Sequence, residues 1–313
     1  MNYFRYLDND TYRRWVETFD GLSEQQTTTV ENAMRTRPNA LRIAVMPLCD
    51  PADTKDLARF AAALKDQIFT NWHICRPANL DKANELPHVA IPGTTWGEIL
   101  QAAAASADFV LPLPLDARLP RHALAHLSLV LEKQPDAVIV YGDEDRLLRS
   151  GRSRPRFKTN FDPFLMLGRD LIGVPALYRS SDILKLAEDT FISTTADNFL
   201  YELALKVSVR VELDRIIHIP AILCHRGKPS GWNAGEGRKA AKAHLADRGI
   251  DGADIRPAPL APQWNRIVFP LPMQPPLVSV IVPTRDRAEL IGACLNGLLT
   301  RTEYASIEIM IVD

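Results

Sequence analysis

The sequence has few cysteines and no long apolar run. Its 313 residues include four cysteines, which lie far apart and form no CxxC pair. Such a distribution indicates neither a disulfide framework nor a zinc ribbon, and it favours a reducing, cytoplasmic location. No apolar run reaches the roughly 18 residues that a transmembrane helix needs, so we expect none. Peripheral association with the inner face of a membrane is compatible with this composition.

Charge of one sign is not in excess either. The 37 Lys and Arg residues are matched by 38 Asp and Glu residues, which gives a formal charge of −1. Nucleic-acid-binding domains usually concentrate positive charge, so the composition indicates no nucleic-acid partner. No glycine fingerprint for a dinucleotide and no phosphate loop occurs. Hydrophobic residues make up 46% of the chain, which indicates a folded protein with a sizeable core.

Strand patterns alternate with helix patterns along most of the chain. A capping box, "SEQQ", opens the second of two helices in the N-terminal region. The expected strands cover 41–48, 72–75, 88–91, 108–113 and 137–141. The expected helices cover 9–19, 54–69, 96–106, 120–134, 197–207 and 235–249. This alternation predicts an α/β fold with a mostly parallel sheet and a helical N-terminal extension.

Composition divides the chain into four predicted regions. A helical extension (1–38) precedes a large α/β domain (39–255). Seven prolines between Arg256 and Pro276 then predict a linker or a wrapped extension over 256–276. In the last region (277–313), "LVSVIVPTRD" repeats the pattern of "LRIAVMPLCD" after about 240 residues. We interpret it as the start of a second α/β domain that stops after one strand-helix-strand unit, so a fragment or truncated product is expected.

Three acids follow the apolar run "AVIVY" at once: Asp143, Glu144 and Asp145. Open parallel sheets bind ligands beyond the carboxyl ends of their strands, which favours a binding or site-shaping role for these acids. The alternative is a solvated turn whose acids cap the next segment.

Several segments together resemble glycosyltransferase family 2. They include "AVMPLCD", "FTNWHIC", "ADFVLPLPLDARLPRHAL", "PDAVIVYGDEDRL", "GRSRPRFKTNFDPFLM", "IIHIPAILCHR" and "SVIVPTRDR", in this order. The resemblance is to bacterial tandem-domain members of the O-antigen or surface-polysaccharide type. It implies a GT-A nucleotide-sugar fold in each domain. It also implies transfer of a sugar from a nucleotide diphosphate sugar to a glycan or lipid-linked glycan acceptor.

The resemblance also implies roles for individual residues. Asp116 would contact a divalent metal (Mg²⁺ or Mn²⁺) or the diphosphate, and His225 would lie near the diphosphate. Asp197 would be the catalytic base. The acceptor cleft would be shaped by Asp143, Glu144, Asp145 and Lys158.

The sequence departs from the family pattern at the donor site. Ala78 and Asn79 stand where the family has two acids that hold the nucleotide base, and Asp116 is the one acid left of a D-x-D-D motif. Asp313 matches the first base-contacting acid of the second domain. Two hypotheses follow: an active glycosyltransferase, or a degenerate, non-catalytic domain that binds glycan or serves as a scaffold for a catalytic second domain.

Simpler structural roles stand beside these functional ones. Asp116 could be an exposed loop acid, and Asp197 could be the N-cap of a helix. The glycine-rich, basic segment 227–239 could hold a phosphate at a helix N-terminus or form a surface loop. Cys49 and Cys75, at strand positions, are expected to be buried as small apolar residues.

Overall fold

The structure is a computed structural model that describes residues 8–36, 41–49, 54–77, 88–93 and 95–312. The chain divides into two compact units. The first unit extends to Ile250 and also includes Ile255–Ile267, and the second consists of Asp251–Asp254 and Val268–Asp313. All predicted site residues that the structure describes lie in the first unit.

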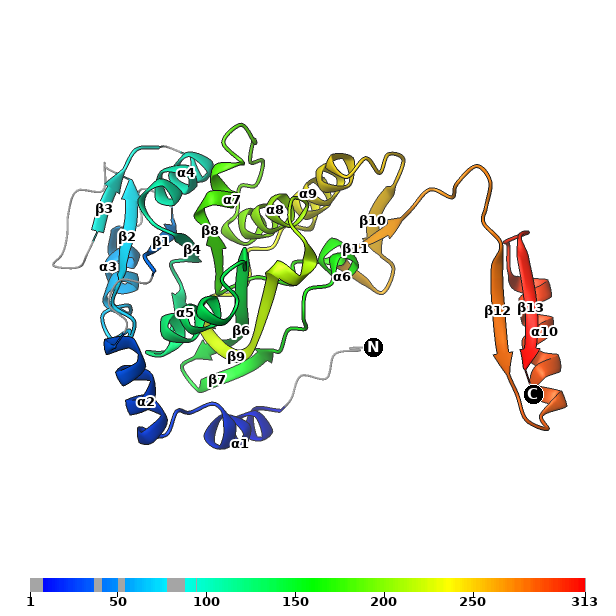
Figure 1. Cartoon of the computed structure of the whole chain (residues 1–313), viewed down its shortest axis with the longest axis horizontal. Coiled ribbons are helices and arrows are strands. Elements are labelled where there is room, and N and C mark those ends of the chain that lie inside the picture. Colours follow the sequence, from blue (N-terminus) through cyan, green and yellow to red (C-terminus); the bar gives the residue numbers. More distant parts are fainter. Residues whose placement is uncertain (1–7, 37–40, 50–53, 78–87, 94, 313) are drawn as a thin grey trace. The chain divides into compact units, whose positions relative to one another are not determined.

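The first unit is built around a nine-stranded sheet. In hydrogen-bonded order its strands are β3 (His88–Ile91), β2 (Trp72–Pro77), β1 (Ile43–Leu48), β4 (Phe109–Pro114), β8 (Ala176–Arg179), β6 (Ile139–Leu148), β9 (Ile216–Arg226) and β5 (Ala117–Arg118), with β7 (Gly151–Arg156) on β6. Strands β5, β7 and β8 run antiparallel to their neighbours, and the other six share one direction (Figure 1). The predicted α/β fold with a mostly parallel sheet is confirmed.

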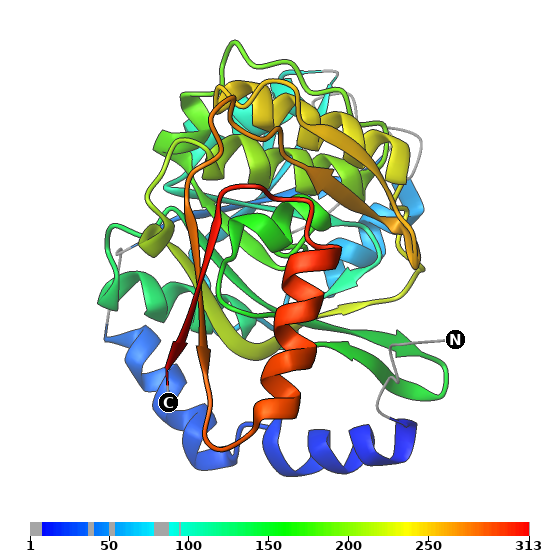
Figure 2. The ribbon, with the colours of Figure 1, turned by 90° about the vertical axis from the view of Figure 1, so that its right-hand side faces the viewer.

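Helices connect and cover these strands. They are α1 (Asn9–Phe19), α2 (Glu24–Arg35), α3 (Thr54–Ala62), α4 (Trp96–Ser106), α5 (Ala123–Lys133), α6 (Pro163–Gly168), α7 (Ser180–Leu184), α8 (Ala196–Ser208) and α9 (Ala234–Asp247). Helix α4 packs on α7, and α8 packs on α9. The rings of Trp96 and Phe199 join α4 to α8, with centroids 5.4 Å apart. These four helices therefore lie over one face of the sheet (Figure 2).

The core lies along the central strands. All six residues of β1 and all six of β4 are buried. Both strands are continuous apolar runs, as expected for parallel strands that are covered on both faces. Helix α8 adds Phe199 and Tyr201, and α3 adds Phe60, all at most 1% exposed.

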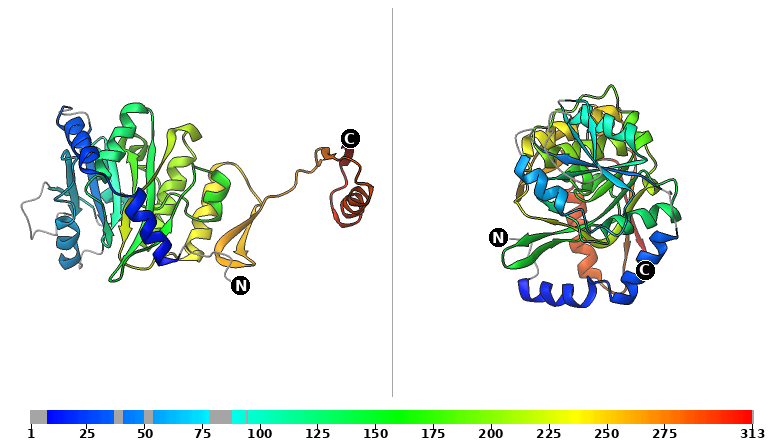
Figure 3. Two further views of the ribbon diagram at one scale, coloured as in Figure 1. Left: turned by 90° about the horizontal axis from the view of Figure 1, so that it is seen from below. Right: turned by 90° about the vertical axis from the view of Figure 1, so that its left-hand side faces the viewer.

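The N-terminal helices lie outside the sheet (Figure 3). The predicted capping box of α2 is present: Ser23 Oγ accepts from the Gln26 backbone N–H, and the Gln26 side chain accepts from the Ser23 N–H. Helix α1 has the predicted bounds, and its N-cap is Asp8, whose side chain accepts from the Thr11 backbone N–H. Helix α1 packs against β7, so the extension belongs to the first unit.

Strand β6 is longer than the sequence indicates. Its expected end was Tyr141, but the strand runs to Leu148 and includes all three acids. Asp145 is paired with His225 of β9, and Glu144 is paired with Arg156 of β7. Acidic residues disfavour strands in general, but here basic partners on both neighbouring strands outweigh that preference.

The first half of the proline-rich stretch forms a hairpin. Strands β10 (Asp254–Ala258) and β11 (Ala261–Val268) pair with each other only. Prolines are tolerated in strands with an unpaired edge. The side-chain amide of Asn265, 6% exposed, donates to the carbonyl of Leu167. This part of the predicted linker is therefore an extension packed on the first unit.

The second unit contains one strand-helix-strand motif. Strand β12 (Val278–Pro283), helix α10 (Ala288–Arg301) and strand β13 (Ile307–Val312) follow one another, and the two strands are parallel. Strands β1 and β2, with α3 between them, have the same arrangement, as the predicted repeat requires. Across both units, the described helices include none with the length and apolar character that crossing a membrane requires.

Candidate functional site

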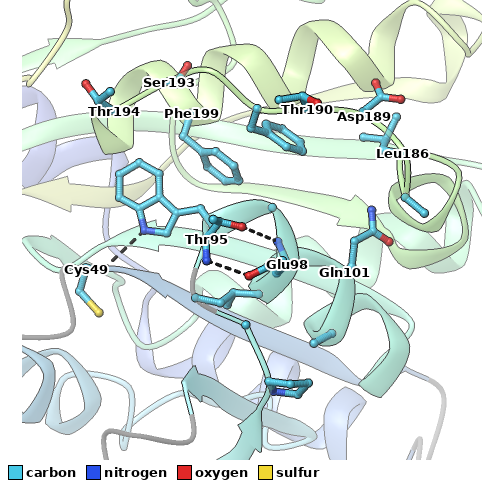
Figure 4. A pocket seen from close by; sticks show the side chains of 18 residues that line it. Cys49, Thr95, Glu98, Gln101, Leu186, Asp189, Thr190, Ser193, Thr194 and Phe199 are labelled. Atoms are coloured by element: carbon cyan, nitrogen blue, oxygen red, sulfur yellow. Dashed lines mark hydrogen bonds between the residues drawn. The ribbon is translucent and has the colours of Figure 1, made fainter.

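A cavity of about 1190 Å³ opens beside the carboxyl end of β1 (Figure 4). It lies between α4, the segment 186–194 and the start of α8. Cys49, which directly follows β1, lines it together with Trp96, Phe191 and Phe199. Open α/β sheets bind ligands at this edge, so the cavity is the candidate binding site.

Aromatic rings form one wall of this cavity. The ring of Phe199 lies 5.4 Å from that of Trp96 and 4.9 Å from that of Phe191, centroid to centroid. The indole N–H of Trp96 donates to the carbonyl of Cys49 at 3.5 Å, which ties α4 to the end of β1. Flat rings at a cavity wall can stack against a planar ligand group such as a nucleobase. The sequence pattern predicts a helix that begins at Trp96, but nothing in it marks these rings as the wall of a cavity.

Two buried or partly buried carboxylates fix the wall segment that runs from Phe191 to Thr194. Glu202 accepts hydrogen bonds from the backbone N–H groups of Ile192 and Ser193 and from the Ser193 hydroxyl. Glu236 accepts from the backbone N–H and the hydroxyl of Thr194. The backbone of this wall is therefore held in place without a ligand.

A second cluster joins Asp116, Arg226 and Asp197. The guanidinium of Arg226 forms a fork on Asp116, with Nε 2.9 Å from Oδ2 and Nη2 3.2 Å from Oδ1. Its Nη1 donates to Asp197 Oδ1 at 2.9 Å. One arginine therefore links the predicted metal ligand to the predicted catalytic base. Arg226 is the second residue of the dipeptide "HR" at the end of β9, and nothing in the sequence marks it as part of a site.

The loop after β9 closes over the same two acids. The backbone N–H of Lys228 donates to Asp116 Oδ2 at 2.9 Å. The Ser230 hydroxyl and the Gly231 N–H both donate to Asp197 Oδ2. Burial alone would raise the pKa of Asp197, but the charge of Arg226 and these hydrogen bonds lower it below its usual value. Asp197 is thus a stable carboxylate with both oxygens engaged.

The cluster and the cavity lie at the same edge of the sheet. Strands β1 and β4 are parallel neighbours, with Leu48 paired to Pro114. Cys49 and Asp116 follow the ends of these two strands. Asp197 lies in the first turn of α8, three residues after the cavity residue Thr194.

The N-cap of α8 is Thr195, so the expectation that Asp197 caps this helix is wrong.

The acid triplet of β6 is buried, and its solvated-turn interpretation is wrong. Asp143, Glu144 and Asp145 are 3%, 8% and 1% exposed. Glu144 Oε1 accepts from Arg156 Nη1 at 2.8 Å. Asp143 Oδ1 accepts from the backbone N–H of Lys158 and lies 2.8 Å from His218 Nε2.

Asp145 connects three further elements. Its carboxylate accepts from the Tyr12 hydroxyl of α1 at 2.6 Å and from Arg152 Nε of β7 at 2.6 Å. Its other oxygen lies 2.6 Å from His225 Nδ1 of β9. The structure thus brings His225, a predicted diphosphate-site residue, to the triplet through this hydrogen bond.

Lys158 lies in the interior rather than on the surface of a cleft. It is 8% exposed, and its Nζ donates to the carbonyl groups of Gly142, Ile172 and Val174 at 2.6 to 2.8 Å. Burial lowers the pKa of its ammonium group to about 8. The structure therefore does not bring Lys158 to the acceptor-facing position that the family resemblance implies.

Three predicted positions cannot be placed: Ala78, Asn79 and Asp313 lie outside the described residues. Of the two strand cysteines, Cys75 is buried and Cys49 is partly exposed in the cavity wall.

The donor set at Asp116 does not fit a divalent cation. Mg²⁺ and Mn²⁺ need several oxygen ligands with free lone pairs, which come from one or two carboxylates, from waters and from substrate phosphates. Both oxygens of Asp116 accept from Arg226, and one also accepts from Lys228. Within the described part of the chain, no group of three or more His, Cys, Asp or Glu residues is placed to hold a metal ion.

Two curated proteins are similar to this chain in sequence. "O-antigen biosynthesis protein RfbC" of Myxococcus xanthus is 26% identical over 302 residues, which cover 86% of this chain and 23% of that protein. "Uncharacterized protein y4gI" of Sinorhizobium fredii is 25% identical over 313 residues, 90% of this chain and 34% of that protein. The chain thus spans about a quarter to a third of the length of these relatives.

A solved structure with a similar arrangement is a mannosyltransferase of Pyrobaculum calidifontis in complex with GDP-Man and Mn²⁺. It shares 14% sequence identity, covers 73% of this chain and 72% of its own, and has a TM-score of 0.45. A score of this size carries no residue roles across. No family model matches the chain. The similarity to RfbC agrees with the resemblance to bacterial surface-polysaccharide glycosyltransferases that the sequence motifs indicate.

Proposed function

We propose that the first unit binds a nucleotide diphosphate sugar in the cavity beside Cys49, as part of a protein that transfers sugar to a cell-surface polysaccharide or its lipid-linked precursor. The observation that carries this proposal is the position of the cavity at the carboxyl end of the parallel strand β1. The relative named for O-antigen biosynthesis supports the acceptor class.

The chemistry of the cavity suits such a donor. Its volume of about 1190 Å³ is large enough for a nucleotide with an attached sugar. The rings of Trp96 and Phe199 offer a stacking surface for the base. Arg226, at the same edge of the sheet, uses three of its five N–H donors on Asp116 and Asp197, and the other two can donate to the diphosphate.

Calorimetric titration of the 313-residue chain with UDP, GDP and dTDP tests this proposal. We expect one of the three nucleotides to bind. Loss of a stacked ring costs about 1–3 kcal/mol, so Trp96→Leu is expected to weaken that binding by about fivefold or more. Trp15→Leu is the matched control, because Trp15 lies on α1 and does not line the cavity.

The outcomes separate the two parts of the proposal. Absence of binding for all three nucleotides would overturn the donor class. Binding that Trp96→Leu and Trp15→Leu leave equally strong would show that the ligand sits elsewhere.

One observation favours a second candidate function, a non-catalytic sugar-binding or scaffold domain. Asp197 would have to accept a proton as the catalytic base, but its pKa is lowered and both its oxygens already accept hydrogen bonds. A general base works best when its pKa lies near the working pH.

A transfer assay with Asp197→Asn decides between the two candidates. If Asp197 is the base, we expect turnover to fall by about 10²–10⁴-fold while nucleotide binding persists. Nucleotide binding by the unaltered chain without any donor turnover, in the presence of polysaccharide precursors, would instead support the non-catalytic function. Asp136→Asn, at an exposed carboxylate that does not line the cavity, serves as the matched control.

A further inference from the structure

The Asp116–Arg226–Asp197 cluster has its own resident cation. Two carboxylates from different parts of the chain meet at one guanidinium, and their side chains are 9% and 12% exposed. An arginine side chain carries a fixed positive charge and a planar fork of five N–H donors. Three of these donors are used on the two acids, which leaves two for a further anion.

Arg226 is well placed to neutralise the two acids, because it is hydrogen-bonded to both and stays positively charged. The fork on Asp116 is bidentate, the strongest arrangement of an arginine and a carboxylate. The charges of Asp197 and Asp116 raise the pKa of Arg226 above its already high value, although burial acts in the opposite direction. The guanidinium therefore stays charged at any pH at which the chain is folded.

A divalent cation at this place would have to displace the guanidinium. A Mn²⁺ ion would need lone pairs of Asp116 that now accept from Arg226 and from the Lys228 backbone. Removing one partner of a buried ion pair is strongly destabilising, and a positive metal beside a fixed positive guanidinium is repelled.

We infer that Arg226 supplies the positive charge between Asp116 and Asp197 in place of a divalent cation, and that a nucleotide diphosphate binds at this edge without metal. The second half of this inference rests on the proposed function. The first half concerns the chain alone and can be tested without any nucleotide.

The test of the first half is Mn²⁺ binding followed by electron paramagnetic resonance, without nucleotide. We expect the unaltered chain and Asp116→Asn to take up Mn²⁺ equally weakly. Arg226→Gln leaves two adjacent carboxylates without their cation, so it is expected to gain Mn²⁺ affinity by at least tenfold. The double variant Arg226→Gln with Asp116→Asn should lose that gain. Arg226→Lys keeps the charge and should behave as the unaltered chain.

Tight Mn²⁺ binding by the unaltered chain that Asp116→Asn weakens tenfold would overturn the inference. Thermal unfolding of the unaltered chain in Mn²⁺ and in EDTA adds a measurement that needs no variant. Ligands that bind the folded state raise its melting temperature, so we expect the two temperatures to agree. A saturable rise in Mn²⁺ would contradict the inference even if Arg226→Gln did not fold.

Titration with the preferred nucleotide in EDTA tests the second half. We expect the affinity to equal that in Mn²⁺, and an absolute requirement for Mn²⁺ would overturn metal-free binding. If no nucleotide binds under either condition, the proposed function fails. The Mn²⁺ measurements without nucleotide still decide the role of Arg226, so the two failures are distinguishable.

Discussion

At the scale of single residues, Lys158 shows how this protein accommodates a charge in its interior. Its ammonium group meets three backbone carbonyls, one from β6 and two from the segment before β8. Three carbonyl dipoles directed at one cation satisfy all three of its N–H donors. The side chain thus fixes the path of the chain between these segments.

Replacement of Lys158 by Met tests this role. Met has a similar length but no donor, so three buried carbonyls would lose their partner, and we expect a loss of about 2–4 kcal/mol in the free energy of unfolding. The pKa of Lys158 is about 8 in the folded chain and about 10.4 when unfolded. The unfolded chain therefore binds more protons between these values, and stability due to this group rises from pH 8 to 10.

Urea unfolding at pH 7, 8, 9 and 10 checks the prediction through the difference between the unaltered chain and Lys158→Met. Lys242→Met is the control, because Lys242 is exposed on helix α9. We expect it to change stability by less than about 0.5 kcal/mol at every pH. A pH-independent difference for Lys158→Met would contradict the assigned pKa.

The two acids of the candidate cluster can be predicted from the sequence, but Arg226, which joins them, cannot. Asp116 and Asp197 stand at a strand end and a helix start, positions that draw notice in an α/β pattern. Arg226 follows a histidine at the end of a strand, and nothing in its neighbourhood distinguishes it. Its role exists only because two acids that are 81 residues apart in sequence meet at its side chain.

At the scale of secondary structure elements, strand β6 organises the first unit. The ladders of β6 with β7 and β9 shift register within the triplet, between Asp143 and Glu144 and between Glu144 and Arg146, so simple strand alternation does not describe these side chains. Asp143 accepts a hydrogen bond from the Lys158 backbone N–H, and Glu144 accepts one from the Arg156 guanidinium. Asp145 accepts one from the Tyr12 hydroxyl. The triplet therefore ties β6 to α1, to β7 and to the segment after β7.

Removal of one hydroxyl should loosen α1. Tyr12 is fully buried, and its hydroxyl donates to Asp145 at 2.6 Å. Without this bond, we expect the free energy of detaching α1 to fall by about 1 kcal/mol in Tyr12→Phe. The hydrogen-exchange rates of the α1 amides should then rise about fivefold. Hydrogen exchange with mass spectrometry measures this, and amides of β1 and β4 should not change.

Tyr304→Phe is the matched control, since its hydroxyl donates to the Pro276 carbonyl in the second unit. It should leave the α1 amides unchanged. Equal exchange of α1 in Tyr12→Phe and in the unaltered chain would show that the hydroxyl does not hold this helix.

The attachment of α1 should weaken only when the pH falls below the usual carboxyl range. Burial raises the pKa of Asp145, but hydrogen bonds from His225, Tyr12 and Arg152 outweigh it, so that pKa lies below its usual value. A depressed carboxyl pKa stabilises the fold above the unfolded value of about 3.9, and this stabilisation is lost as the pH falls through the lower folded value. The attachment of α1 is thus expected to persist at pH 5.

Helices whose ends depend on residues near in sequence were predicted well. Elements whose ends depend on contacts with residues distant in sequence were not. The capping residues around Ser23 and the apolar spacing of α4 depend only on near neighbours in sequence. Helix α3 ends at Ala62, seven residues before its expected end, because the Gln67 side chain is held by the carbonyls of Leu119 and Pro120. Such a contact has no local signature.

At the scale of the whole molecule, the two units differ in how much core they contain. The buried hydrophobic residues between Tyr12 and Leu245 include those of β1, β4 and α8. Among the described residues of β12, α10 and β13, none is buried. Burial of apolar surface is the main favourable term in folding, so the stability of the chain comes from the first unit.

Truncation tests this division. A chain that ends at Val268 keeps the complete core, the cavity and the Asp116–Arg226–Asp197 cluster. We therefore expect it to fold, to unfold within about 2 °C of the full chain by calorimetry, and to bind the same nucleotide with the same affinity.

A chain that ends at Arg248 is the comparison, because it lacks the β10–β11 hairpin and the buried Asn265. We expect it to unfold at a lower temperature than the chain ending at Val268. Loss of nucleotide binding on truncation at Val268 would show that the first unit alone is not the binding unit.

The hydrogen bond between Tyr12 and Asp145 spans 133 positions of the chain. Synthesis proceeds at about 5–20 residues per second, so Tyr12 leaves the ribosome roughly ten seconds before its partner is made. Helix α1 thus cannot dock until the strand that receives it, and then β9 with His225, have been translated. During that interval its apolar face is open to chaperones, and synonymous codons that slow translation before Asp145 would prolong the exposure.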